Sequence, residues 1–126
     1  MEAKKILIVD DSSSIRQQVS AVLVGAGFSM VEAVDGVEGA ECIHSHPELS
    51  LVICDVNMPR LGGLAMLDSV KDELARRSLP VVMLTTEADA DAIAHAKRAG
   101  AKGWLVKPFK DQLLVAVAKK LTLSSP

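Results

Sequence analysis

Residues 51 to 59 read Leu51-Val52-Ile53-Cys54-Asp55-Val56-Asn57-Met58-Pro59. Before Asp55 the run is apolar at every position, with no alternation between polar and apolar side chains. Such a run is typical of a strand buried on both faces, as in a parallel sheet. Because open α/β sheets bind ligands beyond the carboxyl ends of their strands, Asp55 stands where chemistry is expected. On this stretch alone, the same acid could equally cap the turn that follows it.

The composition predicts one ordinary globular domain. A chain of 126 residues suits a single core, and 49% hydrophobic with 24% charged residues argues against disorder. The net charge of −2 and the absence of a run of Lys and Arg argue against direct nucleic-acid binding. No apolar run approaches the ~20 residues of a membrane span, and Met1 is not followed by a signal-peptide core. We therefore expect a cytoplasmic protein without membrane insertion.

The two cysteines do not predict a metal site or a disulfide. Cys42 and Cys54 lack the CxxC spacing of zinc and redox motifs. Cys54 lies inside the apolar run, where a small buried thiol is the simplest interpretation.

A second apolar run repeats the arrangement around Asp55. Residues 6–9 are all apolar and are followed directly by Asp10 and Asp11. Two buried strands are thus expected to present acids at one edge. Ser12 then has the side chain of a helix N-cap, and Gly27 fits just past the end of that helix. We interpret Ser12 as a cap rather than a nucleophile, because no base is spaced to activate it.

The remaining pattern alternates strands with helices. We expect strands at residues 6–9, 28–33, 51–55, 80–84 and 103–106. We expect helices at 12–26, from Asp35 to near His46, 64–77, 88–100, and over a last segment whose buried seam is Leu113, Val117 and Leu121. Five strands alternating with five helices predict an α/β fold, a parallel sheet with helices on both faces. The helix at 88–100 offers little but alanine and Ile93 for packing, so it should bury little area and shift more easily.

Polar residues follow four of these strands at their carboxyl ends: Asp10 and Asp11, Asp55, Thr85, and Lys107 with Pro108. This constellation resembles the receiver domain of two-component response regulators, over nearly the whole chain. Within that family, the form Asp-x-Asn-Met-Pro at residues 55–59 is similar to single-domain chemotaxis receivers. The resemblance implies a flavodoxin-like, doubly wound sheet of five parallel strands in the order 2-1-3-4-5 with five helices.

The resemblance also implies a phosphotransfer site. Asp55 would be the phosphoacceptor, attacking a phosphorylated histidine of a sensor histidine kinase or histidine phosphotransfer protein. Asp10, Asp11, Asp55 and the backbone carbonyl of Asn57 would hold Mg²⁺, which prefers oxygen ligands. Apart from the resemblance, three acids at one edge repel one another, so the charges themselves predict stabilisation by a bound cation.

The same resemblance assigns the residues that sense the phosphoryl group. Lys107 would pair with it as a point charge, the Thr85 hydroxyl would hydrogen-bond it, and the Lys107–Pro108 bond would be cis. Thr85 and Trp104 would form the switch pair. Their movement would remodel a face made by the fourth helix, fifth strand and fifth helix, which would bind a downstream protein.

Some positions depart from the family pattern. Trp104 stands where tyrosine or phenylalanine is more common, Thr86 is bulkier than the usual alanine or glycine, and Gly62 replaces a frequent acid. Asn57 and Glu87 match the polar pair that helps set the rate of self-dephosphorylation in chemotaxis receivers. We therefore expect a short-lived phosphoryl group.

Three functional readings remain. The chain could be a stand-alone signalling switch, with a receiver domain at residues 1–123 and a tail or linker start at 124–126. It could instead be the receiver part of a longer regulator with a DNA-binding or enzymatic output domain. The third reading is a Mg²⁺-dependent aspartyl phosphatase, but that class has a second aspartate two residues after the nucleophile, where this chain has Asn57. We expect no enzyme activity beyond self-phosphorylation and self-dephosphorylation.

Overall fold

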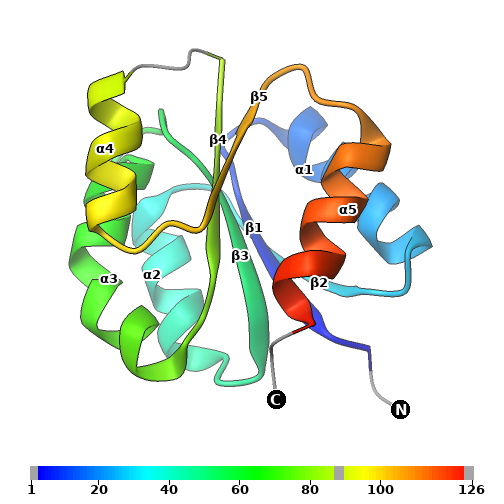
Figure 1. The fold of residues 1–126 in the computed structure, drawn as a ribbon, viewed down its shortest axis with the longest axis horizontal. Helices are drawn as coiled ribbons and strands as arrows, with labels where there is room; N and C mark the ends of the chain where they lie inside the picture. Colours follow the sequence, from blue (N-terminus) through cyan, green and yellow to red (C-terminus); the bar gives the residue numbers. More distant parts are fainter. Residues whose placement is uncertain (1–2, 87–89, 124–126) are drawn as a thin grey trace.

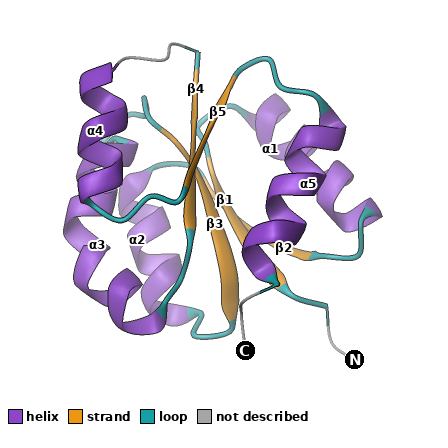
Figure 2. Ribbon diagram, viewed as in Figure 1, coloured by secondary structure: helices purple, strands orange, loops and turns teal. Residues whose placement is uncertain are grey.

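A computed structural model describes residues 3–86 and 90–123. It contains a five-stranded parallel sheet in the order β2-β1-β3-β4-β5, as expected (Figures 1 and 2). The strands are β1 (Lys5–Val9), β2 (Ser29–Ala33), β3 (Leu49–Asp55), β4 (Val81–Thr85) and β5 (Gly103–Val106). The helices are α1 (Ser13–Gly25), α2 (Gly36–Ser45), α3 (Gly63–Arg77), α4 (Ala90–Arg98) and α5 (Asp111–Thr122).

The helices cover the sheet on both faces, which gives three layers. Helices α1 and α5 lie on one face, and α2, α3 and α4 lie on the other (Figure 1). Alternate residues of each strand serve the two faces: Ile6 and Ile8 pack with the α1/α5 core, while Leu7 and Val9 pack with the α2/α3 core. All residues of β3 are buried, so the continuous apolar pattern around residue 51 did mark a central strand.

The predicted helix caps are confirmed. The Ser12 side chain accepts a hydrogen bond from the backbone N–H of Ile15 at 3.3 Å, and Asp35 accepts one from Glu38 at 2.9 Å. Gly27 follows the end of α1 with φ +100°, a conformation that glycine adopts without a steric penalty. Local side-chain chemistry therefore sets where these helices begin and end.

The predicted seam of the last helix is wrong at Leu113 and partly right at Val117 and Leu121. Leu113 is 50% exposed, whereas the neighbouring Leu114 is 1% exposed and packs in the core with Ala118. Val117 and Leu121 are only partly buried at the side of this core. Two apolar stripes run along α5 one residue apart, and helical periodicity alone could not choose between them. Packing of α5 against α1 and the sheet decides which of the two stripes is buried.

The predicted small-residue helix is confirmed within the described residues. In α4 only Ala96 is buried, so this helix has few apolar contacts with the sheet. Residues 87–89, where we expected the helix to start, and the expected tail at 124–126 lie outside the described residues. None of the described helices is both long enough and apolar enough to cross a membrane. Cys42 and Cys54 are free.

Candidate functional site

Three acids meet at the carboxyl ends of β1 and β3. Asp10, Asp11 and Asp55 each place a carboxylate oxygen within 4.8 Å of the others. The cause is the sheet order, since β1 and β3 are neighbours with Val9 opposite Cys54. Asp10 is fully buried, Asp55 is 7% exposed, and Asp11 lies on the surface. The sequence predicted this cluster at the sheet edge.

Both carboxylate oxygens of Asp10 have a partner. Oδ1 accepts a hydrogen bond from the backbone N–H of Ser12 at 2.9 Å, and Oδ2 lies 2.9 Å from Nζ of Lys107. The guanidinium of Arg16 donates to the backbone carbonyl of Asp10 at 2.7 Å. The buried charge is therefore both compensated and held in one orientation, as a buried carboxylate requires.

Lys107 joins two of the acids. Its Nζ lies 2.9 Å from Asp10 Oδ2 and 3.3 Å from Asp55 Oδ1. Burial alone would lower the pKa of Lys107, but its hydrogen bond to Asp10 and the nearby carboxylate charges outweigh burial and raise it. Lys107 therefore stays positively charged. The Lys107–Pro108 peptide bond is cis, as the resemblance implied.

Asp55 has the environment of a more basic carboxylate. Burial raises the pKa of Asp55, the charge of Asp10 raises it further, and Lys107 opposes both effects. A more basic carboxylate is a better nucleophile. The donor set of Asp10, Asp11 and Asp55 consists only of oxygen atoms, partly exposed to water through Asp11, which fits a hard divalent cation such as Mg²⁺.

The predicted switch residues lie on β4 and β5. Thr85 is 3% exposed and comes directly after Leu84, the residue opposite Asp55 in the sheet. Trp104 is partly buried opposite Met83. Its indole Nε1 is buried, yet it has no hydrogen-bond partner among the described residues. A buried N–H without a partner costs free energy.

The structure says less about Asn57 and Glu87, the two residues expected to set the rate of self-dephosphorylation. Asn57 is exposed in the connection between β3 and α3. Glu87 lies outside the described residues. Thr86, the bulky neighbour of Thr85, is exposed.

The sequence did not reveal two residues that brace the site. Arg16 pairs with Glu32 at 3.1 Å while it holds the carbonyl of Asp10. Arg60 pairs with Asp35 at 2.7 Å, which ties the β3–α3 connection to the start of α2. Neither pair follows a sequence motif, because the partners are 16 and 25 residues apart. Arg60 also has a positive φ of 64°, which is unusual for a residue other than glycine.

Fold and site together define a doubly wound α/β domain with an acid cluster and a lysine at the carboxyl edge of its sheet. The model of the response regulator receiver domain family matches residues 6–119, and the chain belongs to this family. Receiver domains are signalling domains.

Individual relatives agree with this assignment. The chain is 38% identical over 118 residues to the chemotaxis protein CheY of Pseudomonas aeruginosa, covering 93% of this chain and 94% of that protein. It is 34% identical over 111 residues to the chemotaxis protein CheY1 of Helicobacter pylori, covering 87% and 90%. The structure of CheY4 of Vibrio cholerae superposes with a TM-score of 0.87 at 37% identity, covering 96% of this chain and 99% of that one.

Proposed function

We propose that this chain is a phosphotransfer switch in which Asp55 accepts a phosphoryl group from the phosphorylated histidine of a partner kinase. An oxygen of the Asp55 carboxylate forms a bond to phosphorus, the histidine N–P bond breaks, and the imidazole nitrogen keeps the electron pair and takes up a proton. An acyl phosphate of Asp55 results. Since such a transfer needs little covalent help, the surrounding residues act by alignment and charge neutralisation.

The observation that carries the proposal is the position of Lys107 between two acids. A phosphoryl group on Asp55 adds negative charge beside the carboxylates of Asp10 and Asp11. The ammonium group of Lys107, 3.3 Å from Asp55, is placed to compensate that charge. A structural salt bridge to Asp10 alone would not need Lys107 to approach Asp55 as well.

Mg²⁺ would be held by Asp10, Asp11, Asp55 and the backbone carbonyl of Asn57. When bound, it would neutralise the acids and polarise the phosphoryl oxygens. The bonds of Asp10 to Ser12 and Lys107 support this role, because they hold its carboxylate in one orientation. Asp11, which is exposed, leaves the cluster open to water and to the incoming phosphoryl donor.

The output would be a change on the face formed by α4, β5 and α5. Phosphorylation would draw the Thr85 hydroxyl toward the phosphoryl group and let the Trp104 ring turn. The unpartnered indole N–H supports a second ring position, and the small buried area of α4 supports its displacement. We infer that the target of this face is a protein.

The lifetime of the phosphoryl group would be short. Asn57 and Glu87 are the residues to which we assign this property. A half-life of many hours for the acyl phosphate would contradict the assignment without affecting the role of Asp55.

Phosphorylation tests the proposal directly. Incubation with acetyl phosphate and Mg²⁺ should add one phosphoryl group per chain, detected by intact-mass spectrometry. The Asp55→Asn variant should remain unmodified, and Lys107→Ala should slow the reaction or weaken the response. Equal modification of Asp55→Asn would show that Asp55 is not the acceptor. Measuring the hydrolysis of p-nitrophenyl phosphate on the same samples would detect a true phosphatase.

A further inference from the structure

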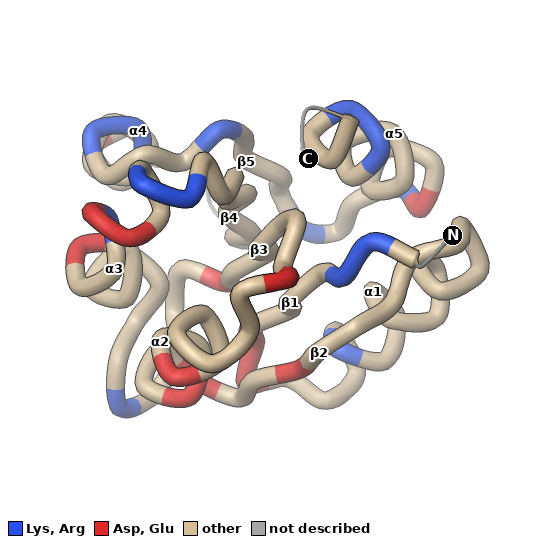
Figure 3. Tube along the Cα trace, turned by 90° about the horizontal axis from the view of Figure 1, so that it is seen from below, with Lys and Arg blue, Asp and Glu red and all other residues tan. Residues whose placement is uncertain are grey.

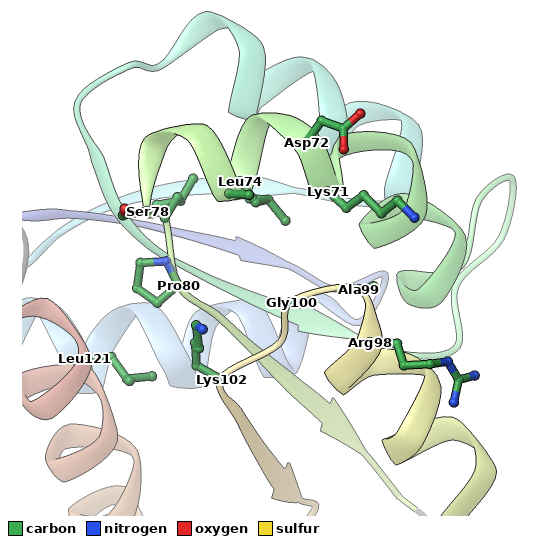
Figure 4. Close-up of a pocket in the computed structure, with 12 residues that line it drawn as sticks. Lys71, Asp72, Leu74, Ser78, Pro80, Arg98, Ala99, Gly100, Lys102 and Leu121 are labelled. Atoms are coloured by element: carbon green, nitrogen blue, oxygen red, sulfur yellow. The ribbon is translucent and has the colours of Figure 1, made fainter.

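A cavity lies at the opposite end of the sheet from the acid cluster. It has a volume of about 670 Å³ and opens between the carboxyl ends of α3 and α4, the starts of β4 and β5, and the last turn of α5 (Figure 4). Pro80, which precedes β4, and Lys102, which precedes β5, line it. This size falls within the range of about 300–1,000 Å³ that is usual for ligand sites.

The rim of the cavity is basic and its floor is apolar. Three basic residues line it against one acid, which gives the lining a net charge of +2 in a chain whose total is −2: Lys71, Arg98 and Lys102 against Asp72. The Asp72 carboxylate points away from the cavity in Figure 4. Leu74 and Leu79, both almost fully buried, contribute to the apolar floor with Leu121. Figure 3 shows the same concentration of Lys and Arg around the end of α4 and its connection to β5.

The three cations lack an evident structural task. Neither a hydrogen bond nor an ion pair joins the side chains of Lys71, Arg98 or Lys102 to another residue in the described ranges. Arg98 ends α4, where a cation favours the helix dipole. That explanation does not cover Lys71, which lies in the middle of α3, or Lys102, which follows α4 in the connection to β5. Their charges are available to a ligand.

Spaced side-chain cations, and not free backbone N–H groups, are the groups that could bind anions in this cavity. Phosphate sites use the free N–H groups of helix amino termini, whereas α3 and α4 both direct their carboxyl ends here. Nucleotide sites also use aromatic stacking, and the residues that line this cavity include no aromatic side chain. Three cations from separate elements match several spaced negative charges. The apolar floor matches one aliphatic side chain between them.

We propose that this cavity is a docking site for an acidic segment of a partner protein, one that inserts an aliphatic side chain between carboxylates. The three cations would pair with the carboxylates, and the floor around Leu74 and Leu79 would bury the aliphatic anchor. Because Asp55, Thr85 and Lys107 lie at the other end of the strands, a partner docked here does not cover the phosphoacceptor. The phosphoacceptor would therefore stay accessible to its phosphoryl donor while the partner is docked.

The test uses the full chain and a defined probe. The probe is a short amidated peptide with one leucine flanked on both sides by glutamate and aspartate, titrated into the isotope-labelled chain and followed by amide chemical shifts. The shifts should change around residues 71–80 and 98–102. Two control peptides, one with serine in place of the leucine and one with glutamine and asparagine in place of the acids, should bind more weakly.

Matched variants distinguish binding of the peptide in the cavity from its non-specific electrostatic attraction to basic residues elsewhere on the surface. Lys102→Glu should weaken binding of the peptide about tenfold. Lys119→Glu reverses an exposed lysine of α5 that does not line the cavity, and it should leave the affinity nearly unchanged. Shifts spread over the basic surface, equal binding of the serine peptide, or the same shifts with inorganic phosphate at equal ionic strength would each overturn the proposal. Circular dichroism of both variants verifies that they remain folded.

Discussion

The guanidinium of Arg60 donates two hydrogen bonds to the carboxylate of Asp35, from Nε to Oδ2 at 2.7 Å and from Nη2 to Oδ1 at 3.2 Å. Asp35 is also the N-cap of α2, and the carbonyl of Leu61, next to Arg60, accepts a hydrogen bond from the N–H of Gly36. The connection that carries Asn57 is thus fastened at two adjacent residues to the start of another helix. Arg60 itself has a left-handed backbone conformation, with φ 64°.

Removing the Arg60–Asp35 pair should lower the stability of the folded chain by an amount that depends on pH. The hydrogen bonds from Arg60, followed by the N–H of Glu38, lower the pKa of Asp35 in the folded state. The resulting stabilisation is present above the ordinary pKa of 3.8 and is lost as the pH falls through the lowered value. Arg60→Ala should therefore reduce the melting temperature by roughly a few degrees at neutral pH. Denaturant melts at decreasing pH should show the difference shrinking, and a constant difference would contradict this mechanism.

Mg²⁺ should stabilise the folded chain. Because a cation relieves the repulsion among Asp10, Asp11 and Asp55, Mg²⁺ at ten times its Kd should add about 1.4 kcal/mol. Thermal melts with EDTA and with Mg²⁺ measure the effect. Asp11→Asn is the most suitable variant, because Asp11 is exposed and its loss should weaken the Mg²⁺ effect without disturbing the core. Identical melting temperatures in EDTA and Mg²⁺ would argue against a metal site.

Asp55→Asn should stabilise the metal-free protein. Burial and Asp10 raise the pKa of Asp55, so the folded protein binds this proton more readily than the unfolded chain does. The charged group therefore costs stability above its ordinary pKa, and that cost is relieved as the pH falls through the raised value. In EDTA at neutral pH the variant should gain about 1 kcal/mol in the free energy of unfolding, as often found at functional sites. The gain should disappear in acid. A less stable variant at neutral pH would refute the prediction.

Trp104 should report the switch. It is the only tryptophan in the chain, and its indole N–H is buried without a partner among the described residues. Adding beryllofluoride with Mg²⁺, which mimics a phosphoryl group, should change its fluorescence. Thr85→Ala should reduce the change, whereas Thr85→Ser, which keeps the hydroxyl, should preserve it. If the fluorescence of the parent chain stays constant while the mimic binds, Trp104 has no role in switching.

Two glycines should respond oppositely to alanine. A Cβ on Gly63 would lie 2.2 Å from the backbone carbonyl oxygen of Asp55 and 2.9 Å from Cε of Met83. Gly63→Ala should therefore destabilise by ~1–3 kcal/mol and slow phosphorylation of Asp55. Gly25, at the end of α1, has no atom within 4 Å of such a Cβ. Gly25→Ala should be neutral or stabilising by up to about 1 kcal/mol. Urea melts of both variants make the comparison, and similar losses would contradict it.

The fold was largely predictable, because the signals that determine it are local. The unbroken apolar runs before Asp10 and Asp55 marked buried parallel strands, and Ser12 and Asp35 marked helix starts by capping chemistry. The helical seam of α5 was not predictable. Leu113 and Leu114 are equally apolar, and only the surface against which α5 packs makes one exposed and the other buried.

The sequence by itself determined which acids stand at the edge of the sheet, since an acid directly after a buried strand has nowhere else to lie. It also determined, through its resemblance to receivers, the expected roles of Thr85, Trp104 and Lys107. The tertiary structure alone decided that Lys107 contacts both Asp10 and Asp55 and that Arg60 forms an ion pair with Asp35. The basic cavity around Lys102 likewise exists only in three dimensions. These contacts join residues from distant elements, and their distances depend on how the helices pack on the sheet, which no local pattern specifies.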